Sequence, residues 1–312
     1  MISFTPRRTY DFMGKRSLWI AISVFAMIAA CAIVWMRGIN WGIDFLGGAK
    51  LTYHLSAEAT EGAIQETLTA AHLEAQVQRF GEVREQRFLI KVKAGETQNT
   101  EVVAQITAQL TERFGSETQL EAQESVGPRV GKELRTRGIK IILYVLAALL
   151  VYIGFRFDFF FAPGALVALA HDLILTVGAL VIAGTEFNLT ILAALLTILG
   201  YSINDTIIIY DRIREHGKEI TPDTVAAVIN RSLTETLPRT ILTSVTVLIA
   251  VVCLFLLARG EIRDFAYAFI VGIVTGTYSS IFIASPIYMW LYHRAGTKRA
   301  DGPNRHQSVV SR

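Results

Sequence analysis

Six long apolar segments constrain this sequence more than any other feature. A helix needs about 20 mostly apolar residues to cross the hydrocarbon core of a membrane, and each segment meets that length. Charged residues make up only 18% of the 312 residues, against roughly 25% in a soluble domain. We therefore predict an α-helical membrane protein with six transmembrane helices. The predicted spans are 18–36, 138–155, 161–183, 189–210, 237–258 and 265–292.

Lys and Arg in the short connections predict the orientation, because cytoplasmic loops carry an excess of both. With six spans, the tail 1–17, the connection 211–236 and the tail 293–312 share one side of the membrane, and each is rich in basic residues. Both termini are therefore expected to be cytoplasmic. The run 18–36 is longer than the apolar part of a signal peptide and has no small-x-small cleavage site at its end, so we expect a retained first span. The basic residues concerned are Arg7, Arg8, Lys15, Arg16, Arg212, Arg214, Lys218, Arg231, Arg294, Lys298, Arg299 and Arg305.

One polar stretch, 37–137, separates the first span from the other five. Its hydrophobic patterns predict the element order βαββαβ, which is typical of a ferredoxin-like α+β domain. The orientation places this domain in the periplasm. Its size and its lack of a catalytic cluster indicate a binding or mechanical element rather than an enzyme. The predicted strands are 49–55, 75–80, 87–93 and 118–125, and the predicted helices are 58–72 and 99–114.

The connection 211–236 contains a further predicted helix. Thr221, Pro222 and Asp223 form a helix start, and an apolar stripe follows at helical spacing. The favoured interpretation is a helix lying along the membrane surface, and the alternative is a docking site for a cytoplasmic partner. The stripe consists of Val225, Val228, Ile229 and Leu233.

Two carboxyl groups, Asp172 and Asp205, lie within predicted spans. An Asp at a helix centre costs roughly 2.5–3.5 kcal/mol on insertion scales, and such groups commonly mark ion or proton routes. We predict a functional site at Asp205, while Asp172, beside His171, fits a functional and a structural role equally. For both groups the alternative is a hydrogen bond that fixes helix packing. Further polar or small residues share the span of Asp205, namely Thr197, Gly200, Tyr201, Ser202, Asn204 and Thr206, of which Ser202, Asn204 and Thr206 are candidate supporting residues.

Arg239 is the predicted partner of Asp205. It follows Pro238, a residue suited to the first helical turn, so we expect Arg239 at the start of the fifth span. Burial favours a neutral carboxylic acid and a nearby guanidinium favours the carboxylate, so alternating approach of Arg239 would couple proton uptake and release to helix movement. The membrane potential supplies roughly 2.3 kcal/mol per charge per 100 mV. Simple extension of Arg239 toward lipid headgroups is the alternative, and the coupling ion, H⁺ or Na⁺, stays open with H⁺ favoured.

Several function classes lack their sequence signatures. No GxxxxGK[ST], HExxH, GxSxG or GxGxxG motif occurs, so we expect no nucleotide hydrolysis, no cofactor and no metal. The net charge of +3 gives no reason to expect a nucleic-acid partner. A ridge of small residues in the sixth span permits close helix contact, within the bundle or with another chain. The ridge consists of Gly272, Gly276, Ser280 and Ala284.

Five stretches spread over nearly the whole chain resemble the SecF family of the bacterial Sec protein-export machinery. Residues 41–48 read WGIDFLGG, similar to the GIDFxGG motif that leads into the family's periplasmic domain. Residues 200–206 read GYSINDT and continue into YDRIR at 210–214, which is the most specific resemblance. The remaining stretches are VGPRVGKE at 126–133, LPRT at 237–240 and GTYSS at 276–280.

The resemblance implies an RND-like bundle of transmembrane helices in a bacterial inner membrane and a SecD partner with pseudo-symmetric helices. It implies that the pair assists the SecYEG channel and uses the proton-motive force to promote export and release of unfolded polypeptides. It places the family's proton-relay residues at Asp205 and Arg239, with a second intramembrane carboxyl group from SecD. Contacts with YajC, YidC and membrane lipids are also expected. The alternatives are an RND-type exporter of small molecules or lipids and a static assembly scaffold.

Overall fold

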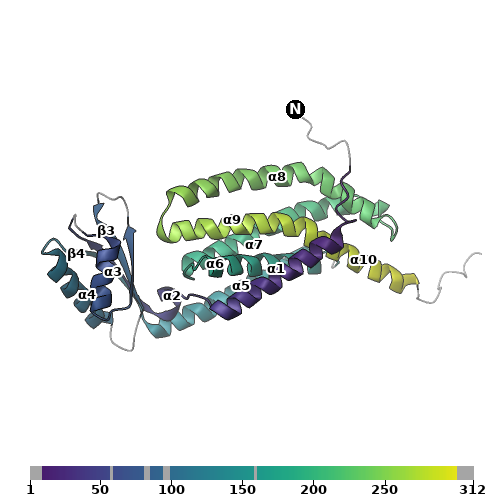
Figure 1. The fold of residues 1–312 in the computed structure, drawn as a ribbon. Coiled ribbons are helices and arrows are strands. Elements are labelled where there is room, and N and C mark those ends of the chain that lie inside the picture. Colours follow the sequence, from purple (N-terminus) through teal and green to yellow (C-terminus); the bar gives the residue numbers. More distant parts are fainter. Residues whose placement is uncertain (1–8, 57–58, 81–84, 94–98, 158–159, 301–312) are drawn as a thin grey trace, which may run out of the picture.

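The structure is a computed structural model that describes residues 9–56, 59–80, 85–93, 99–157 and 160–300. The predicted cytoplasmic residues Arg7, Arg8 and Arg305 lie outside these ranges. A bundle of long helices forms one part of the molecule, and a small sheet with two helices lies at one end of it (Figure 1).

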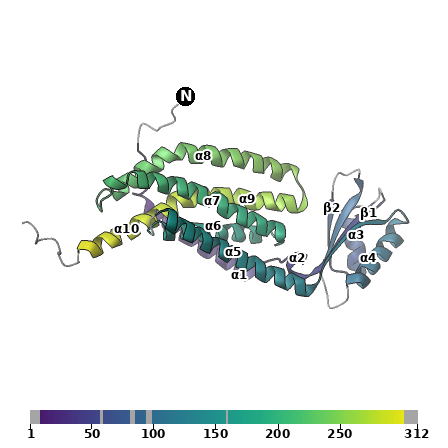
Figure 2. The same cartoon turned by 180° about the vertical axis from the view of Figure 1, so that it is seen from behind.

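The described chain contains six helical runs that are long and apolar enough to cross a membrane, which confirms the predicted number of spans. The third, fourth and sixth runs form the inner part of the bundle, whereas the first, second and fifth expose most of their apolar side chains. Figure 2 shows the long helices side by side. The runs are α1 (Arg16–Arg37), α5 (Pro128–Arg156), α6 (Ala162–Ile182), α7 (Leu189–Glu215), α8 (Val225–Leu257) and a last run of α9 (Gly260–Ser279), the π-helical segment η3 (Ser280–Ala284) and α10 (Ser285–Ala300).

The predicted connection 211–236 is mostly helical and packs on the bundle. Helix α7 continues to Glu215, a 3-10 turn η2 (Gly217–Glu219) follows, and α8 begins at Val225. The apolar stripe is buried in the core of the bundle instead of lying free along the membrane surface. The amino-terminal segment also covers this part of α8, because the Asn230 Oδ1 atom accepts hydrogen bonds from the main-chain N–H groups of Phe12 and Met13, both at 3.0 Å.

The prediction that Pro238 and Arg239 lie in the first turn of the fifth spanning helix is wrong. Pro238 lies inside α8, thirteen residues after its first residue, Val225. Proline removes one main-chain hydrogen bond from a helix, but membrane helices tolerate it when neighbouring groups satisfy the freed carbonyl. Arg239 consequently lies in the middle of a helix.

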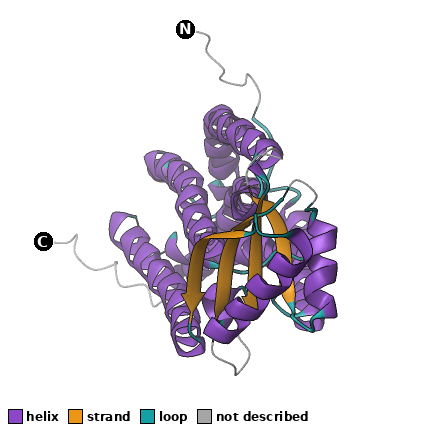
Figure 3. Ribbon diagram, turned by 90° about the vertical axis from the view of Figure 1, so that its left-hand side faces the viewer, coloured by secondary structure: helices purple, strands orange, loops and turns teal. Residues whose placement is uncertain are grey.

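The sheet domain has the predicted order βαββαβ. Its elements are β1 (Gly48–His54), α3 (Glu61–Ala70), β2 (Ala75–Phe80), β3 (Arg87–Lys93), α4 (Asn99–Phe114) and β4 (Gln119–Val126). The strands pair antiparallel in the order β2-β3-β1-β4, and both helices cover one face of the sheet (Figure 3). Alternate residues of β1 and β3, such as Leu51 and Ile90, are fully buried under Ile64 of α3 and Ile106 of α4. The ferredoxin-like prediction is confirmed.

Two of the quoted motifs meet where the chain passes into and out of this domain. A short helix α2 (Ile43–Leu46) leads to Gly47, whose φ of +90° suits glycine. A Cβ atom at Gly47 would lie 2.8 Å from the backbone of Pro128, the first residue of α5. Stretches 41–48 and 126–133 therefore pack together at the junction of the domain and the bundle.

Candidate functional site

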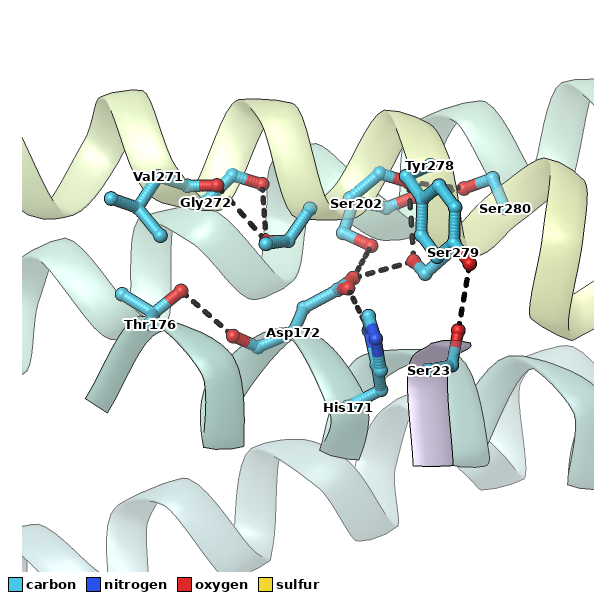
Figure 4. Close-up of polar contacts among 12 residues, drawn as sticks. Ser23, His171, Asp172, Thr176, Ser202, Val271, Gly272, Tyr278, Ser279 and Ser280 are labelled. Atoms are coloured by element: carbon cyan, nitrogen blue, oxygen red, sulfur yellow. Dashed lines mark hydrogen bonds and ion pairs between the residues drawn. The ribbon is translucent and has the colours of Figure 1, made fainter. Parts of the chain in front are cut away.

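A polar layer crosses the middle of the bundle, and Asp172 of α6 lies at its centre (Figure 4). Asp172 has no exposed surface. Its Oδ2 atom accepts hydrogen bonds from the Ser202 hydroxyl of α7 at 2.6 Å and from the Ser279 hydroxyl of α9 at 2.8 Å. Its Oδ1 atom lies 3.0 Å from the Nδ1 atom of His171. One carboxyl group thus joins three helices.

The same layer continues between α7 and the last helical run. The hydroxyls of Thr206 and Ser280 are hydrogen-bonded at 2.8 Å. At Ser280 the helix changes from α to π geometry, a change that is frequent at functional sites. The predicted small-residue ridge allows this contact, because a Cβ atom at Gly276 would lie only 3.0 Å from the Cβ atom of Ser202. The ridge therefore packs within this chain.

Asp205 lies next to Thr206 but interacts with α8. Only 1% of its surface is exposed, and its Oδ2 atom has no hydrogen-bond partner within the described residues. The groups that act on its carboxyl are the Ser244 hydroxyl and the Arg239 guanidinium. The Ser244 hydroxyl also pairs with the Thr277 hydroxyl of α9 at 2.8 Å. A buried oxygen atom without a partner is costly, so this carboxyl is held in an incompletely satisfied state.

Arg239 and Asn204 lie on the outside of the bundle. Both residues are exposed, and no ion pair within 4.0 Å joins Arg239 to Asp205 in the described chain. Thr197 and Gly200 of α7 are exposed as well. We call Thr197, Gly200, Asn204 and Arg239 the outer polar strip. The structure thus brings Ser202 to Asp172 and Thr206 to Ser280, leaves Arg239 close enough to act on the charge of Asp205 without an ion pair among the described residues, and places Asn204 on the exposed side of α7.

A second charged group, absent from the sequence predictions, joins the sheet domain to the bundle. We call it the interface cluster. The pairing register of β1 and β3 sets Lys50 directly opposite Lys91, an arrangement that is destabilising without compensation. Glu261 offsets the repulsion between the two lysines, because its Oε1 atom lies 3.1 Å from the Lys50 Nζ atom and 3.2 Å from the Lys91 Nζ atom. The cluster consists of Asp44, Lys50, Lys91, Glu186 and Glu261, with Asp44–Lys50 at 3.1 Å and Glu186–Lys91 at 2.8 Å.

The charge of Lys50 is stabilised by its acidic neighbours. Burial alone would lower the pKa of Lys50, but the carboxylates of Asp44 and Glu261 outweigh burial and raise the pKa above its ordinary value. Lys50 therefore stays charged in every physiological condition.

The interface cluster also holds the first turns of the central helices. The Asp44 Oδ2 atom accepts a hydrogen bond from the main-chain N–H of Leu189 at 3.0 Å, and the Glu261 Oε2 atom accepts one from the Thr190 hydroxyl at 3.1 Å. The domain is therefore fastened to the ends of α7 and α9, the two helices that also carry the polar layer. Within the described residues no group of three His, Cys, Asp or Glu side chains is placed to hold a metal ion.

Comparison with known proteins gives consistent matches. Residues 106–294 match the family model described as protein export membrane protein SecD/SecF, C-terminal. The protein translocase subunit SecF of Desulfurispirillum indicum is 40% identical over 286 residues, which cover 89% of this chain and 90% of that protein. The SecF subunit of Pseudomonas aeruginosa is 38% identical over 286 residues, covering 91% and 92%.

Solved structures give the same result for the fold. The crystal structure of SecDF, a translocon-associated membrane protein from Thermus thermophilus, superposes with a TM-score of 0.77 at 34% identity over 90% of this chain. A second SecDF structure, in a super-membrane-facing form, gives a TM-score of 0.71 at 32% identity over 95% of this chain. This chain spans only 38% and 40% of those two SecDF chains.

Proposed function

Because this chain belongs to the SecD/SecF family of protein-export membrane proteins and matches its SecF subunits along most of their length, we propose that it works with a SecD partner as a proton-driven subunit of the Sec translocase. The pair would use the proton-motive force to promote export and release of unfolded polypeptides through the SecYEG channel. Asp205 and Arg239 are the proposed proton relay.

The observation that carries this proposal is the state of Asp205. Asp205 belongs to a helix long and apolar enough to span a membrane, and its carboxyl group is buried. One oxygen atom of this carboxyl group has no hydrogen-bond partner among the described residues, and the neighbouring helix α8 carries Arg239. Intramembrane carboxyl groups of this kind commonly belong to proton relays. A bound proton removes the buried negative charge, and approach of the guanidinium stabilises that charge after the proton leaves. Movement of α8 against α7 would alternate these two conditions.

The outer polar strip supports a partner in the membrane. The hydrocarbon tails of lipids do not hydrogen-bond to a guanidinium or an amide, so polar groups exposed at that depth are costly unless they face protein or a water-filled cavity. Arg239 and Asn204 are both exposed in this chain. We infer that helices of the SecD partner cover this strip and bring a second carboxyl group to it.

We further propose that both termini lie in the cytoplasm and the sheet domain in the periplasm of a bacterial inner membrane. The excess of Lys and Arg in tail 1–17, connection 211–236 and tail 293–312 supports this orientation. The domain boundaries proposed from the sequence, 37–137 for the periplasmic domain and 138–292 for spans two to six, fit it. Contacts with YajC, YidC and membrane lipids belong to the same proposal.

The test is export of a secretory precursor into membrane vesicles with and without an imposed proton gradient. The Asp205→Asn variant keeps the size of the side chain but cannot carry the charge, and it is expected to export at the same rate in both conditions. Asp211→Asn is the matched control, because it makes the same change six residues further along α7, where the half-exposed Asp211 lies 3.7 Å from Arg156, and it is expected to keep the gradient stimulation. Gradient-stimulated export by Asp205→Asn at the normal protein level contradicts the proposal.

Two other functions give different results in the same system. If the chain is a static assembly scaffold, the Asp205→Asn variant exports as well as the wild type. Export then falls only when the amount of the chain in the membrane is lowered. An exporter of small molecules or lipids would make cells lacking the chain sensitive to toxic compounds without accumulation of secretory precursors. Precursor accumulation without such sensitivity supports the translocase subunit.

A further inference from the structure

His171 and Asp172 form an enclosed pair that the Asp205–Arg239 relay does not use. Neither side chain has any exposed surface. The Asp172 carboxyl accepts hydrogen bonds from the Ser202 and Ser279 hydroxyls and is also hydrogen-bonded to the Nδ1 atom of His171. The Nε2 atom of the same ring has no hydrogen-bond partner within the described residues. We propose that His171 and Asp172 together form a second proton-binding site in the membrane-spanning bundle, with Nε2 as the atom that takes up and releases the proton.

The charge of the pair decides its chemistry. Ser202 and Ser279 both donate to Asp172, an arrangement that suits an ionised carboxylate. A lone carboxylate in such surroundings costs several kcal/mol, and within the described residues His171 is its only ion-pair partner. With a proton on each ring nitrogen, the pair is neutral overall. Loss of one proton leaves a net negative charge.

The bonding pattern shows which proton exchanges. The Nδ1 proton is held between the ring and the Asp172 carboxyl over 3.0 Å. A proton on Nε2 makes no hydrogen bond to the described residues. Its transfer to a water molecule therefore leaves all three hydrogen bonds of the Asp172 carboxyl in place. In the loaded state both nitrogen atoms of His171 carry protons, and in the unloaded state only Nδ1 does.

Few other titratable groups face this pair. From α9, the ring of Tyr278 stacks on His171 at a centroid distance of 6.0 Å, and its hydroxyl is hydrogen-bonded to Ser23 of α1 at 2.9 Å. From α7, the facing residue is Ser202, with Asp205 three residues further along the same helix. Helix α5, η3 and α10 contribute no ion pair to His171 or Asp172 in the described chain, and the rings of Tyr210 and Tyr288 pack around Phe161 at the start of α6.

The location gives the site a mechanical consequence. The Asp172 carboxyl joins α6 to α7 and α9, so a change in the charge of the pair acts on the contact among these three helices. Asp205 and Ser202 lie on the same helix, α7, so a displacement of α7 moves groups of both sites. The site itself needs no role for Asp205, and it binds its proton whether or not the relay works as proposed.

The direct test is nitrogen NMR of the full chain with its SecD partner in lipid vesicles, with ¹⁵N-labelled histidine. The His171 signals are assigned by their absence in His171→Gln. The expected result is a change of the Nε2 signal from its protonated to its unprotonated position as the pH is raised over the range in which the protein stays folded. An Nε2 signal that stays at one position over this range overturns the proposal, and the wild-type protein alone decides this.

Variants separate the pair from its surroundings. Asp172→Asn removes the carboxylate and is expected to leave His171 uncharged over the whole range. Thr176→Val is the matched control, because among the described residues the Thr176 hydroxyl donates to the main-chain oxygen of Asp172 and not to its carboxyl, and the His171 signal is expected to shift as in the wild type. An unchanged shift in Asp172→Asn contradicts the paired site.

Asp205→Asn distinguishes this proposal from the proposed function. It is expected to keep the His171 shift while it loses gradient-stimulated export. A retained shift together with normal export would overturn the Asp205 relay and leave the second site standing.

Discussion

At the scale of single residues, two aspartates in adjacent helices are held in opposite ways. Asp172 is surrounded by donors from three helices, whereas Asp205 has a buried oxygen atom without a partner among the described residues. A fully satisfied buried group stabilises one arrangement, and a partly satisfied one is easily changed by a proton or a nearby charge. Asp205 is therefore the more suitable of the two for a group that alternates between partners.

Arg239→Gln is expected to reduce gradient-driven export to the rate measured without a gradient. Glutamine retains hydrogen bonding but cannot stabilise the Asp205 carboxylate after its proton leaves. Arg239→Lys keeps the charge on a point donor without the planar fork, so partial stimulation is expected. The measurement is precursor export into vesicles at matched protein levels. Thr246→Val, on an exposed position of the same helix, serves as the control, and full stimulation in Arg239→Gln would contradict the role of the guanidinium.

Sequence patterns located both aspartates and proposed Arg239 as the partner of Asp205, but they did not connect Asp172 with its two serines. A carboxyl group inside an apolar run is visible in the sequence because its cost there is high. The serines that bind Asp172 come from positions 30 and 107 residues away, and only the folded bundle brings them together. The outward position of Asn204 also needed the structure, since residues at neighbouring positions of one helix differ in the faces they present.

At the scale of helices and strands, a close contact of α7 with α9 carries part of the polar layer. A Cβ atom at Gly276 of α9 would lie 3.0 Å from the Cβ atom of Ser202 of α7, closer than most such contacts in proteins. Small residues let membrane helices approach until their main chains are near each other, which strengthens packing and interhelical hydrogen bonds. The Thr206–Ser280 bond at 2.8 Å depends on this approach.

Gly276→Ala is expected to destabilise the chain by about 1–3 kcal/mol, the usual cost of overpacking a core. Gly200→Ala is the matched control, because Gly200 lies inside α7 with open space around it. Alanine there is expected to stabilise the helix by about 0.5–1 kcal/mol. Unfolding of the purified chain in detergent micelles measures both. Equal stability of the two variants would show that α7 and α9 do not pack as closely as described.

The strands and most helices were predictable because their signals are local. The four strands follow a period of two residues, and strands β2 and β3 begin and end as predicted. The start of α8 at Val225 follows the helix start predicted at Thr221, Pro222 and Asp223. Its unbroken continuation into the fifth span was not predictable in the same way, since Pro238 and polar residues before it imitate a helix boundary. The buried stripe of α8 and the hydrogen bonds from the amino-terminal segment override that local signal.

At the scale of the whole molecule, the interface cluster is the connection through which the sheet domain and the bundle act on each other. Lys91 has only 5% of its side chain exposed and contacts both Glu186 and Glu261. The two acids come from the loop before α7 and from the first turn of α9. A displacement of either helix is therefore transmitted to β3, and so to the sheet domain that the proposed function places in the periplasm.

Lys91→Met tests this connection, because methionine keeps much of the length of the side chain and removes the charge. Breaking a buried ion pair by removing one partner costs about 3–5 kcal/mol, since Glu186 then loses its cation. Spin labels at Glu112 of α4 and Ile262 of α9, with both native cysteines replaced, are expected to report a broadened distribution of distances in the variant. Gradient-stimulated export is expected to fall in parallel.

Lys93→Met is the matched control. Lys93 lies two residues along the same strand, on the same face, but is exposed, so this variant is expected to keep a narrow distribution of distances. A narrow distribution in Lys91→Met as well would mean that packing of residues 41–48 against α5 holds the domain without the charges, and that movement of α7 and α9 reaches the domain by that route instead.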